Sequence, residues 1–378
     1  MSRREAWTAV AACVLLALAA GALVRTFAAP APQEFFLHDQ QVYLSMARQP
    51  FVQTGMLYPP ASWRILPPLA ARAIGALLHA DPERGFLVLT FSAFALIPVA
   101  TFAFLAALGL PLDTAVAGTA LVALSPNTLG YTAWDVVRVD PSALALMCLC
   151  AYAVASGKPA LLVVSIAALS VTKETALVGA SFAVAWALGV DRRLLRAAVL
   201  SFALAVVVRA VVLPALIPPP APFDNFYSFR EMIHEELTVV YAARRLLLAS
   251  GTSWNVLLPF AAVWLVDEWR NPRAHALLVA IVVAEAQILF ASDTQRLTAA
   301  AYPFVIACCA SQLQRFAPRQ RAVAGAALLV AQLPWLLENG RVVHLAWLRG
   351  VEIAIVIVSA SLAVWRLSLA TRPRTASA

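Results

Sequence analysis

An acidic residue lies near the start of a long polar segment, residues 28–83, between the first two apolar stretches. Asp39 is followed at intervals of four by Tyr43 and Ala47, so a helix would carry all three on one face. A carboxylate there could accept a proton from an attacking hydroxyl group, although an Asp before an apolar-periodic stretch is also a common N-cap. His38 could orient a substrate, but a single loop histidine is more often only solvated. We predict that Asp39 is a catalytic base, with His38 and Tyr43 as supporting residues.

Basic residues that could hold an anion recur in four separate polar segments. Arginine offers a forked, permanently charged donor that suits a phosphate group, and lysine offers a point charge. The candidates are Arg64, Arg138, Lys173 and Arg296. Carboxylates lie near them, so these cations could instead form local ion pairs that close the ends of helices. The neighbouring carboxylates, which we treat as supporting residues, are Asp135, Asp140, Glu174 and Asp293.

Two charged residues interrupt an otherwise continuous apolar block. The stretches 159–172 and 175–190 are short and meet at Lys173 and Glu174. A break in a helix at membrane depth is tolerated only where it lines a polar cavity, and ionisable residues at such a place often serve a site. The break therefore favours a functional role for Lys173 and Glu174.

The elements that must position these residues are membrane helices. The chain is 62% hydrophobic and 13% charged, whereas a soluble domain is about half apolar and a quarter charged. We therefore predict an all-α, polytopic membrane bundle that forms a single domain. The formal charge of +8 fits arginines at anionic lipid, and no sequence motif indicates a nucleic-acid partner.

Apolar runs long enough to cross the hydrocarbon as helices predict about twelve spans. They lie near 7–27, 84–108, 113–131, 140–156, 159–172, 175–190, 196–217, 253–268, 273–291, 297–313, 321–337 and 348–367.

The distribution of basic residues predicts the orientation of these spans. If the N-terminus is cytoplasmic, fourteen basic residues lie on the cytoplasmic side and five lie in the short outer loops, in agreement with the positive-inside rule. Both termini are then cytoplasmic, in the plasma (inner) membrane. All the candidate site residues fall together on the extracytoplasmic face.

Two long outer segments, residues 28–83 and 218–252, each contain an amphipathic stretch. The stretches 64–78 and 228–248 carry charges beside periodic apolar residues, and helices of this kind lie in the interface.

Some polar residues lie within the apolar stretches themselves. Arg209 and Glu285 could pair across the bundle or extend outward, and we assign them no catalytic role. The five cysteines are predicted to be packing residues. They are Cys13, Cys148, Cys150, Cys308 and Cys309.

Taken together, these residues resemble the GT-C superfamily of membrane glycosyltransferases, which take sugars from polyprenyl-phosphate carriers. Members have a multi-span helical bundle and a large first extracytoplasmic loop. That loop carries an acid near its start, followed by a tyrosine and a small residue at four-residue intervals. The stretches that carry the resemblance are Asp39, Tyr43 and Ala47, then residues 63–67, 171–175 and 293–303.

The resemblance implies an inverting transfer at the anomeric carbon of a sugar attached to a lipid phosphate. Asp39 would deprotonate the acceptor hydroxyl group, and Arg64, Lys173 or Arg296 would stabilise the phosphate leaving group. The partners would be membrane lipid, the polyprenyl-phosphate donor, and an envelope glycan, lipid or protein acceptor. No cofactor is indicated. Because the loop starts with one acid where many members have a pair, a divalent metal stays an open alternative.

Two other functions are compatible with the sequence. A transporter or flippase for a lipid-linked or anionic solute would also use broken helices, but its charges usually lie near the midplane and its halves usually repeat. A non-catalytic scaffold for envelope assembly is the third alternative.

Overall fold

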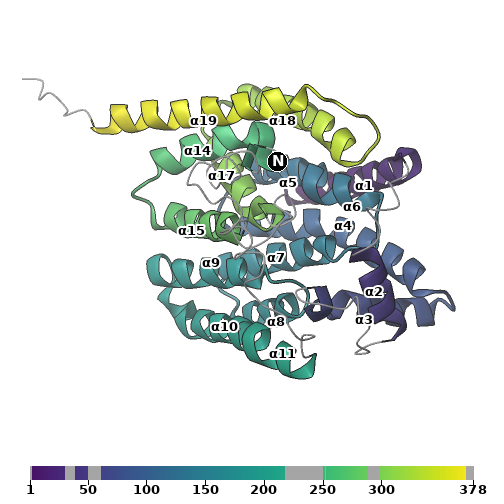
Figure 1. Ribbon diagram of the computed structural model, residues 1–378. Helices are drawn as coiled ribbons and strands as arrows, with labels where there is room; N and C mark the ends of the chain where they lie inside the picture. Colours follow the sequence, from purple (N-terminus) through teal and green to yellow (C-terminus); the bar gives the residue numbers. More distant parts are fainter. Residues whose placement is uncertain are drawn as a thin grey trace, which may run out of the picture.

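The computed structural model describes residues 2–29, 39–49, 61–217, 250–251, 253–287 and 298–371. The regular secondary structure of these residues is entirely helical (Figure 1). This agrees with the predicted helical membrane bundle.

Within the described part of the chain, five helical stretches are long and apolar enough to cross a membrane. They are α1 (Arg3–Phe27), α4 (Pro82–Ala107), the stretch Arg192–Leu216, α18 (Pro318–Asn339) and a final stretch Leu348–Leu369 within α19 (Leu348–Thr371). The stretch Arg192–Leu216 joins the 3-10 helix η4 (Arg192–Leu194), α10 (Leu195–Val207), the π-helix η5 (Val208–Val212) and α11 (Leu213–Leu216).

Shorter helices occupy the positions of the other predicted spans. They are α5 (Leu112–Ala123), α7 (Asp140–Ala155), α8 (Pro159–Ser170), α9 (Ala176–Gly189), α14 (Leu258–Asp267), α15 (Pro272–Ala286) and α17 (Tyr302–Gln314). The count of twelve crossings therefore stays a prediction.

The helices place their connections at two opposite ends of the bundle. At the first end, Arg273 donates to the Leu108 carbonyl oxygen (3.0 Å) and Arg321 pairs with Asp113 (2.5 Å). These contacts join the α4–α5, α14–α15 and α17–α18 connections.

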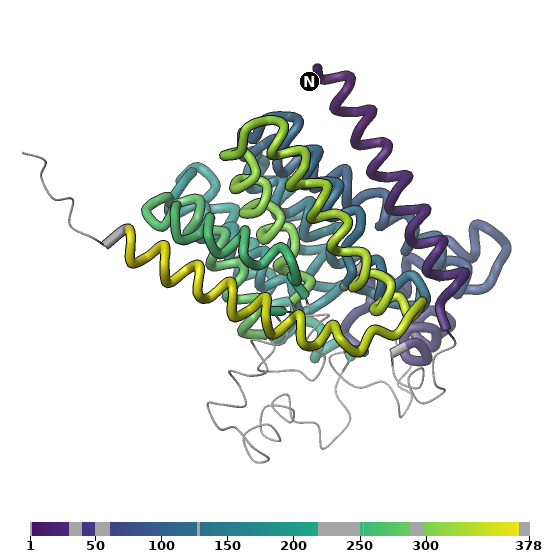
Figure 2. The backbone as a smooth tube through the Cα atoms, turned by 90° about the horizontal axis from the view of Figure 1, so that it is seen from above, coloured from purple at the N-terminus to yellow at the C-terminus, as the bar shows by residue number. Residues whose placement is uncertain are grey.

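At the second end, which we call the site end, the chain after α1 meets the α18–α19 connection (Figure 2). Ala29 donates its backbone N–H to the Arg341 carbonyl oxygen (2.8 Å), and the Trp134 indole donates to the Asn339 carbonyl oxygen (3.2 Å). Segments far apart in the sequence thus meet at one end, as the alternating topology requires. Which end faces the cell exterior stays a prediction.

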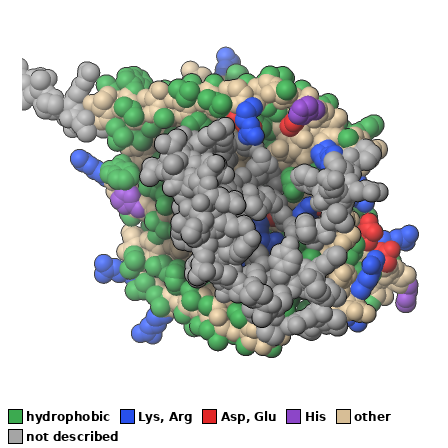
Figure 3. Space-filling model, in the orientation of Figure 1, with side chains coloured by type: hydrophobic (Ala, Val, Ile, Leu, Met, Phe, Trp, Pro, Cys, Tyr) green, Lys and Arg blue, Asp and Glu red, His purple; other side chains and the backbone are tan. Residues whose placement is uncertain are grey.

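The outer helices carry exposed apolar side chains, as a lipid solvent requires. Along α10 to α11, Val199, Leu200, Val211 and Leu216 are each more than half exposed. Hydrophobic side chains likewise recur around the rim of the view in Figure 3.

Inside the bundle, Phe104 of α4, Phe182 of α9 and Phe304 of α17 pack ring against ring, with centroids 4.7 to 6.4 Å apart. All five cysteines are also buried in the interior, and none forms a disulfide. This confirms that they are packing residues.

Two short helices of the first polar segment pack against α4. The helix α2 (Asp39–Arg48) presents Tyr43 and Ala47, both fully buried, to Ala71 of α3 (Leu66–Leu77) and Phe86 of α4. The predicted amphipathic helix at 64–78 therefore exists. It begins at Leu66 because prolines follow there, and a proline at the first turn loses no helical hydrogen bond. The second predicted surface helix, 228–248, lies outside the described residues.

The contact between α3 and α4 leaves no room for a side chain. A Cβ atom on Gly85 would lie 1.8 Å from the Ala71 carbonyl oxygen and 3.0 Å from the Gly75 nitrogen. The backbones of the two helices touch there, so α3 is held at one height along α4.

We predict that Gly85→Ala forces α3 away from α4 and lowers the free energy of unfolding by about 1–3 kcal/mol, as overpacking does. The measurement is reversible unfolding in mixed detergent micelles. Gly325→Ala on α18 is the matched control, because its new Cβ atom would meet only Ala117, at 3.9 Å. Equal stability of the two variants would contradict the close α3–α4 contact.

Candidate functional site

The site is built around the break between α8 and α9. The helix α8 ends at Ser170 and α9 begins at Ala176, as the charged interruption predicts. The backbone N–H groups of Thr172 and Lys173 both donate to the Leu169 carbonyl oxygen (3.0 and 2.8 Å). The turn therefore satisfies its own backbone groups while Lys173 and Glu174 leave the apolar helices.

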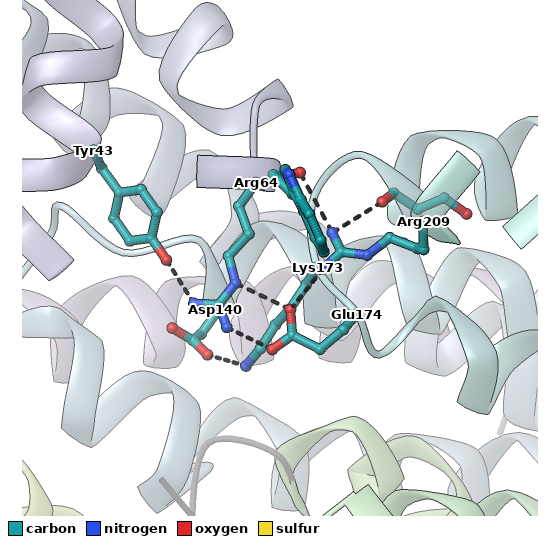
Figure 4. Close-up of polar contacts among 8 residues, drawn as sticks. Tyr43, Arg64, Asp140, Lys173, Glu174 and Arg209 are labelled. Atoms are coloured by element: carbon teal, nitrogen blue, oxygen red, sulfur yellow. Dashed lines mark hydrogen bonds and ion pairs between the residues drawn. The ribbon is translucent and has the colours of Figure 1, made fainter. Parts of the chain in front are cut away.

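Arg64 fastens the first polar segment to this break (Figure 4). Its guanidinium group donates to both carboxylate oxygens of Glu174, through Nε (3.1 Å) and Nη2 (2.5 Å). Its third nitrogen, Nη1, donates to the Tyr43 hydroxyl group of α2 (2.6 Å). A backbone hydrogen bond joins the same two segments: the Leu66 N–H group donates to the Val171 carbonyl oxygen (3.0 Å). One buried arginine thus joins α2, the start of α3 and the helix break.

Arg209 is a site residue that the sequence reasoning missed. It extends from the π-helix η5, and its Nη2 atom lies 3.5 Å from Glu174 Oε2. Its Nη1 atom donates to the carbonyl oxygens of Trp63 and Ser170 (both 3.4 Å), and its guanidinium carbon lies 5.8 Å from the centre of the Trp63 ring. An arginine within an apolar span was the available signal.

The suggested pairing of Arg209 with Glu285 is wrong. Glu285 instead accepts a hydrogen bond from Ser250 (3.0 Å), while Arg209 pairs with Glu174. A π-helix inserts one extra residue into a helical turn. This changes the direction in which Arg209 leaves the helix, so regular periodicity does not predict its partner.

Two further buried ion pairs lie beside this group. Lys173 donates to Asp140 (2.5 Å), which starts α7, and Arg138 donates to Asp135 (2.5 Å). Asp140 at a helix N-terminus also meets the positive end of the helix dipole. Lys173 and Arg138 therefore do form ion pairs with neighbouring carboxylates, as one of the two interpretations predicted. Of the two aspartates near Arg138 in sequence, Asp135 pairs with it.

Glu174 is held as a carboxylate by the cations around it. Burial alone would raise its pKa, but Arg64, Arg209 and Lys173 outweigh that effect and lower the pKa to about 2. Glu174 therefore organises the guanidinium groups and is a poor proton acceptor near neutral pH.

The described cluster combines charges of both signs. It holds four cations and three carboxylates, namely Arg64, Arg138, Lys173 and Arg209 against Asp135, Asp140 and Glu174. Arginine and lysine donors gathered in a largely buried place can bind an anionic ligand such as a phosphate.

Several predicted residues are only partly covered or not covered by the structure. Asp39 is described only as the first residue of α2, four positions before Tyr43, while His38, Asp293 and Arg296 lie outside the described residues. In the part of the chain that is described, no group of three His, Cys, Asp or Glu residues could hold a metal ion.

Comparison with known proteins gives the fold a name. No known family profile matches the sequence, and no curated protein matches it. Solved structures match with probability 1.00. The arabinofuranosyltransferase AftD from Mycobacteria aligns with a TM-score of 0.57 at 18% identity, over 91% of this chain and 27% of that one.

Two further structures are similar over nearly the whole chain. ArnT from Cupriavidus metallidurans has a TM-score of 0.53 at 17% identity, over 98% of this chain and 77% of ArnT. The Archaeoglobus fulgidus oligosaccharyltransferase, in its apo form, has a TM-score of 0.54 at 12% identity, over 98% of this chain and 56% of that one. The chain therefore has the fold of the GT-C glycosyltransferases and spans about a quarter of the length of AftD.

We predict that Glu174→Gln destabilises the protein by about 3 kcal/mol, because it removes the carboxylate that pairs with the buried guanidinium groups of Arg64 and Arg209. Unfolding in mixed detergent micelles measures this change. Glu268→Gln, in an ion pair with Arg315 at the opposite end, is the control and should change stability by less than about 1 kcal/mol.

The pH dependence of this difference tests its electrostatic origin. The folded-state pKa of Glu174, about 2, lies below its ordinary value of 4.5. Its contribution to stability is therefore complete above pH 4.5 and is lost as the pH falls toward about 2. The difference in the free energy of unfolding between the intact protein and Glu174→Gln should narrow over this pH interval. A difference that stays constant would contradict the ion pairing.

Proposed function

We propose that this chain is a membrane glycosyltransferase that moves a sugar from a polyprenyl-phosphate donor to an acceptor hydroxyl group. The observation that carries the proposal is the buried cluster of Arg64, Lys173, Glu174 and Arg209, tied through Tyr43 to the helix that begins at Asp39. It lies within a GT-C fold.

The cations would bind the donor phosphate. Arg64 and Arg209 offer N–H groups on two sides of Glu174, and Lys173 adds a point charge from the same turn. As the glycosidic bond breaks, negative charge grows on the phosphate, and fixed donors in a partly dry site stabilise that charge. The leaving group is a stable anion, so a general acid is unnecessary.

Asp39 would act as the general base. It starts α2, and Tyr43, the residue four positions later, accepts a hydrogen bond from Arg64. The helix α2 is thereby tethered through Tyr43 to the cations that would bind the phosphate. Deprotonation of the acceptor by Asp39, with attack on the face opposite the phosphate, gives inversion at the anomeric carbon.

The donor lipid would reach this site from within the membrane. Arg209 belongs to a helix whose neighbouring residues Val206, Val207 and Val211 are exposed, so lipid surrounds the helix that carries a site cation. With the orientation that the arginines predict, the site end is extracytoplasmic and the membrane is the plasma membrane.

The known neighbours fit a lipid-linked donor. The Archaeoglobus fulgidus oligosaccharyltransferase AglB has been determined with an inhibitory peptide and a dolichol-phosphate, and AftD is an arabinofuranosyltransferase. The sugar and the acceptor of this chain are open within that class.

The position of the charges favours an enzyme over a transporter. A transporter usually holds ionisable residues near the bilayer midplane. Here Arg64, Asp140, Lys173 and Glu174 lie at the ends of helices or in turns between them, and Arg209 lies within its apolar stretch, toward the site end.

We predict that Asp39→Asn lowers sugar transfer at least about a hundredfold, as loss of a general base does, while binding of polyprenyl phosphate is retained. The assay uses membranes, an acceptor extract and radiolabelled polyprenyl-phosphate sugars that carry a pentose or a hexose. Asp81→Asn is the matched control, because Asp81 only caps α4. Full transfer by the Asp39 variant would remove Asp39 from the mechanism.

Arg209→Gln should weaken binding of polyprenyl phosphate about tenfold, because one charge-assisted donor is lost. Microscale thermophoresis of the protein in nanodiscs measures the affinity. Arg72→Gln serves as the control. Arg72 is exposed on α3 and has no ion pair among the described residues. An unchanged affinity for the Arg209 variant would show that Arg209 is only structural.

A further inference from the structure

A polar cavity lies at the end of the bundle opposite the site end. It has a volume of about 540 Å³ and is bounded by the α4–α5 connection, the α14–α15 connection and the end of α17. This volume falls within the range of roughly 300–1,000 Å³ that is typical of small-molecule pockets. We call it the opposite-end cavity, and its polar lining residues are Glu268, Asn271, Arg273, Ser311, Gln314 and Arg315.

Arg273 is a cation with unused donors at this cavity. Its Nη1 atom donates to the Leu108 carbonyl oxygen (3.0 Å), and its guanidinium carbon lies 6.0 Å from the centre of the Trp186 ring. These contacts hold the guanidinium group in place, but neither brings a negative charge to it. Among the described residues, Arg273 has no carboxylate partner. A fixed guanidinium group with free N–H groups suits an oxyanion such as a phosphate.

Two neutral donors line the same cavity. Ser311 lies in the last turn of α17, and Gln314 is the residue at which that helix ends. Within the part of the chain that the structure describes, neither side chain has a hydrogen-bond partner. A hydroxyl group and an amide can both donate to phosphate oxygens, so the two residues could complete the coordination of an anion at Arg273.

Glu268 provides acceptors at another part of the lining. Its Oε1 atom accepts from Arg315 (2.5 Å), and its Oε2 atom accepts from Asn271 (3.0 Å). Each carboxylate oxygen has a second lone pair, so Glu268 can also accept a hydrogen bond from a ligand hydroxyl group. Because a carboxylate repels a doubly charged phosphate, the cavity favours a singly charged phosphodiester that carries hydroxyl groups.

The surroundings of the cavity indicate that such a phosphodiester belongs to a lipid. Val279 and Val282 of α15 are exposed, as expected for a helix that faces acyl chains. Trp269, in the turn between α14 and α15, is 57% exposed, and tryptophan is enriched at the level of the lipid headgroups. With the orientation that the basic residues predict, this end faces the cytoplasmic leaflet, which contains anionic lipids.

We propose that the opposite-end cavity binds the headgroup of an anionic phospholipid with hydroxyl groups, such as phosphatidylglycerol. The phosphodiester contacts Arg273, Ser311 and Gln314, and a hydroxyl group of the headgroup donates to Glu268. This lipid site is separate from the donor site at Arg64 and Glu174, so it does not depend on the proposed function.

Binding of short-chain phosphatidylglycerol to the protein in mixed detergent micelles, measured by native mass spectrometry, tests the site. The intact protein should bind it about tenfold more tightly than phosphatidylcholine of the same chain length, which has no net charge. Arg273→Gln should remove about tenfold in affinity, because a charge-assisted donor is lost, and Arg273→Lys should restore part of it. Arg319→Gln is the matched control, because Arg319 is exposed on α18 and does not line the cavity.

A second variant leaves the contact between Arg273 and the end of α4 intact. Ser311→Ala removes a hydroxyl group that has no partner among the described residues. It should weaken binding of phosphatidylglycerol several-fold without changing thermal unfolding in lipid-free micelles. This separates a role in lipid binding from a role in folding.

The other outcomes would overturn the lipid site. Equal affinity of the intact protein for the two lipids would contradict it, as would full binding of phosphatidylglycerol by both Arg273→Gln and Ser311→Ala. Glycerophosphoglycerol, the same headgroup without acyl chains, should compete weakly, and competition as strong as that of the lipid would indicate a soluble ligand instead. Binding of polyprenyl phosphate in nanodiscs should be unchanged by Arg273→Gln, and a loss there would contradict two separate sites.

Discussion

The site depends on the bidentate pair between Arg64 and Glu174. Neither residue lies within a long membrane helix, yet their contact joins a short helix of the first polar segment to a break between two core helices. A guanidinium group has donors on several edges, so Arg64 binds Glu174 with one edge and Tyr43 with another. A lysine could not keep that geometry, because its single ammonium group lacks the planar fork.

The membrane explains why these charges gather where they do. Backbone and side-chain polar groups in hydrocarbon must find partners within the protein. The break after α8 meets that condition with its own backbone hydrogen bonds, and the charged residues beside it meet it with one another. The opposite end follows the same rule, where Arg315 pairs with Asp267 and Glu268. The difference is that, among the described residues, the most deeply buried ion pairs, Arg138 with Asp135 and Lys173 with Asp140, lie at the site end.

Sequence reasoning succeeded where the signal was local or periodic. The helix break at Lys173 and Glu174, the helix after Arg64 and the shared helix face of Tyr43 and Ala47 all follow from residue type and spacing. The distribution of basic residues predicted that the candidate charged residues lie on one face of the membrane. It could not give the partners, because those depend on distances between segments. Arg209 was missed for this reason, since the π-helix that redirects it has no clear sequence signature. The role of Asp39 rests on its position in α2, and its side chain lies beyond what the structure describes.

The backbone contact at Gly85 links the candidate site to a helix long enough to cross the membrane. Because α3 touches α4 without an intervening side chain, the two helices move as one body, and Arg64 lies two residues before α3. The height of α4 in the membrane is set by the match between its apolar length and the hydrocarbon thickness. The depth of Arg64 in the membrane is therefore tied to that of α4, while Glu174 is positioned by α8 and α9. The Arg64–Glu174 pair thus joins a residue whose depth follows one membrane helix to a residue held by two others.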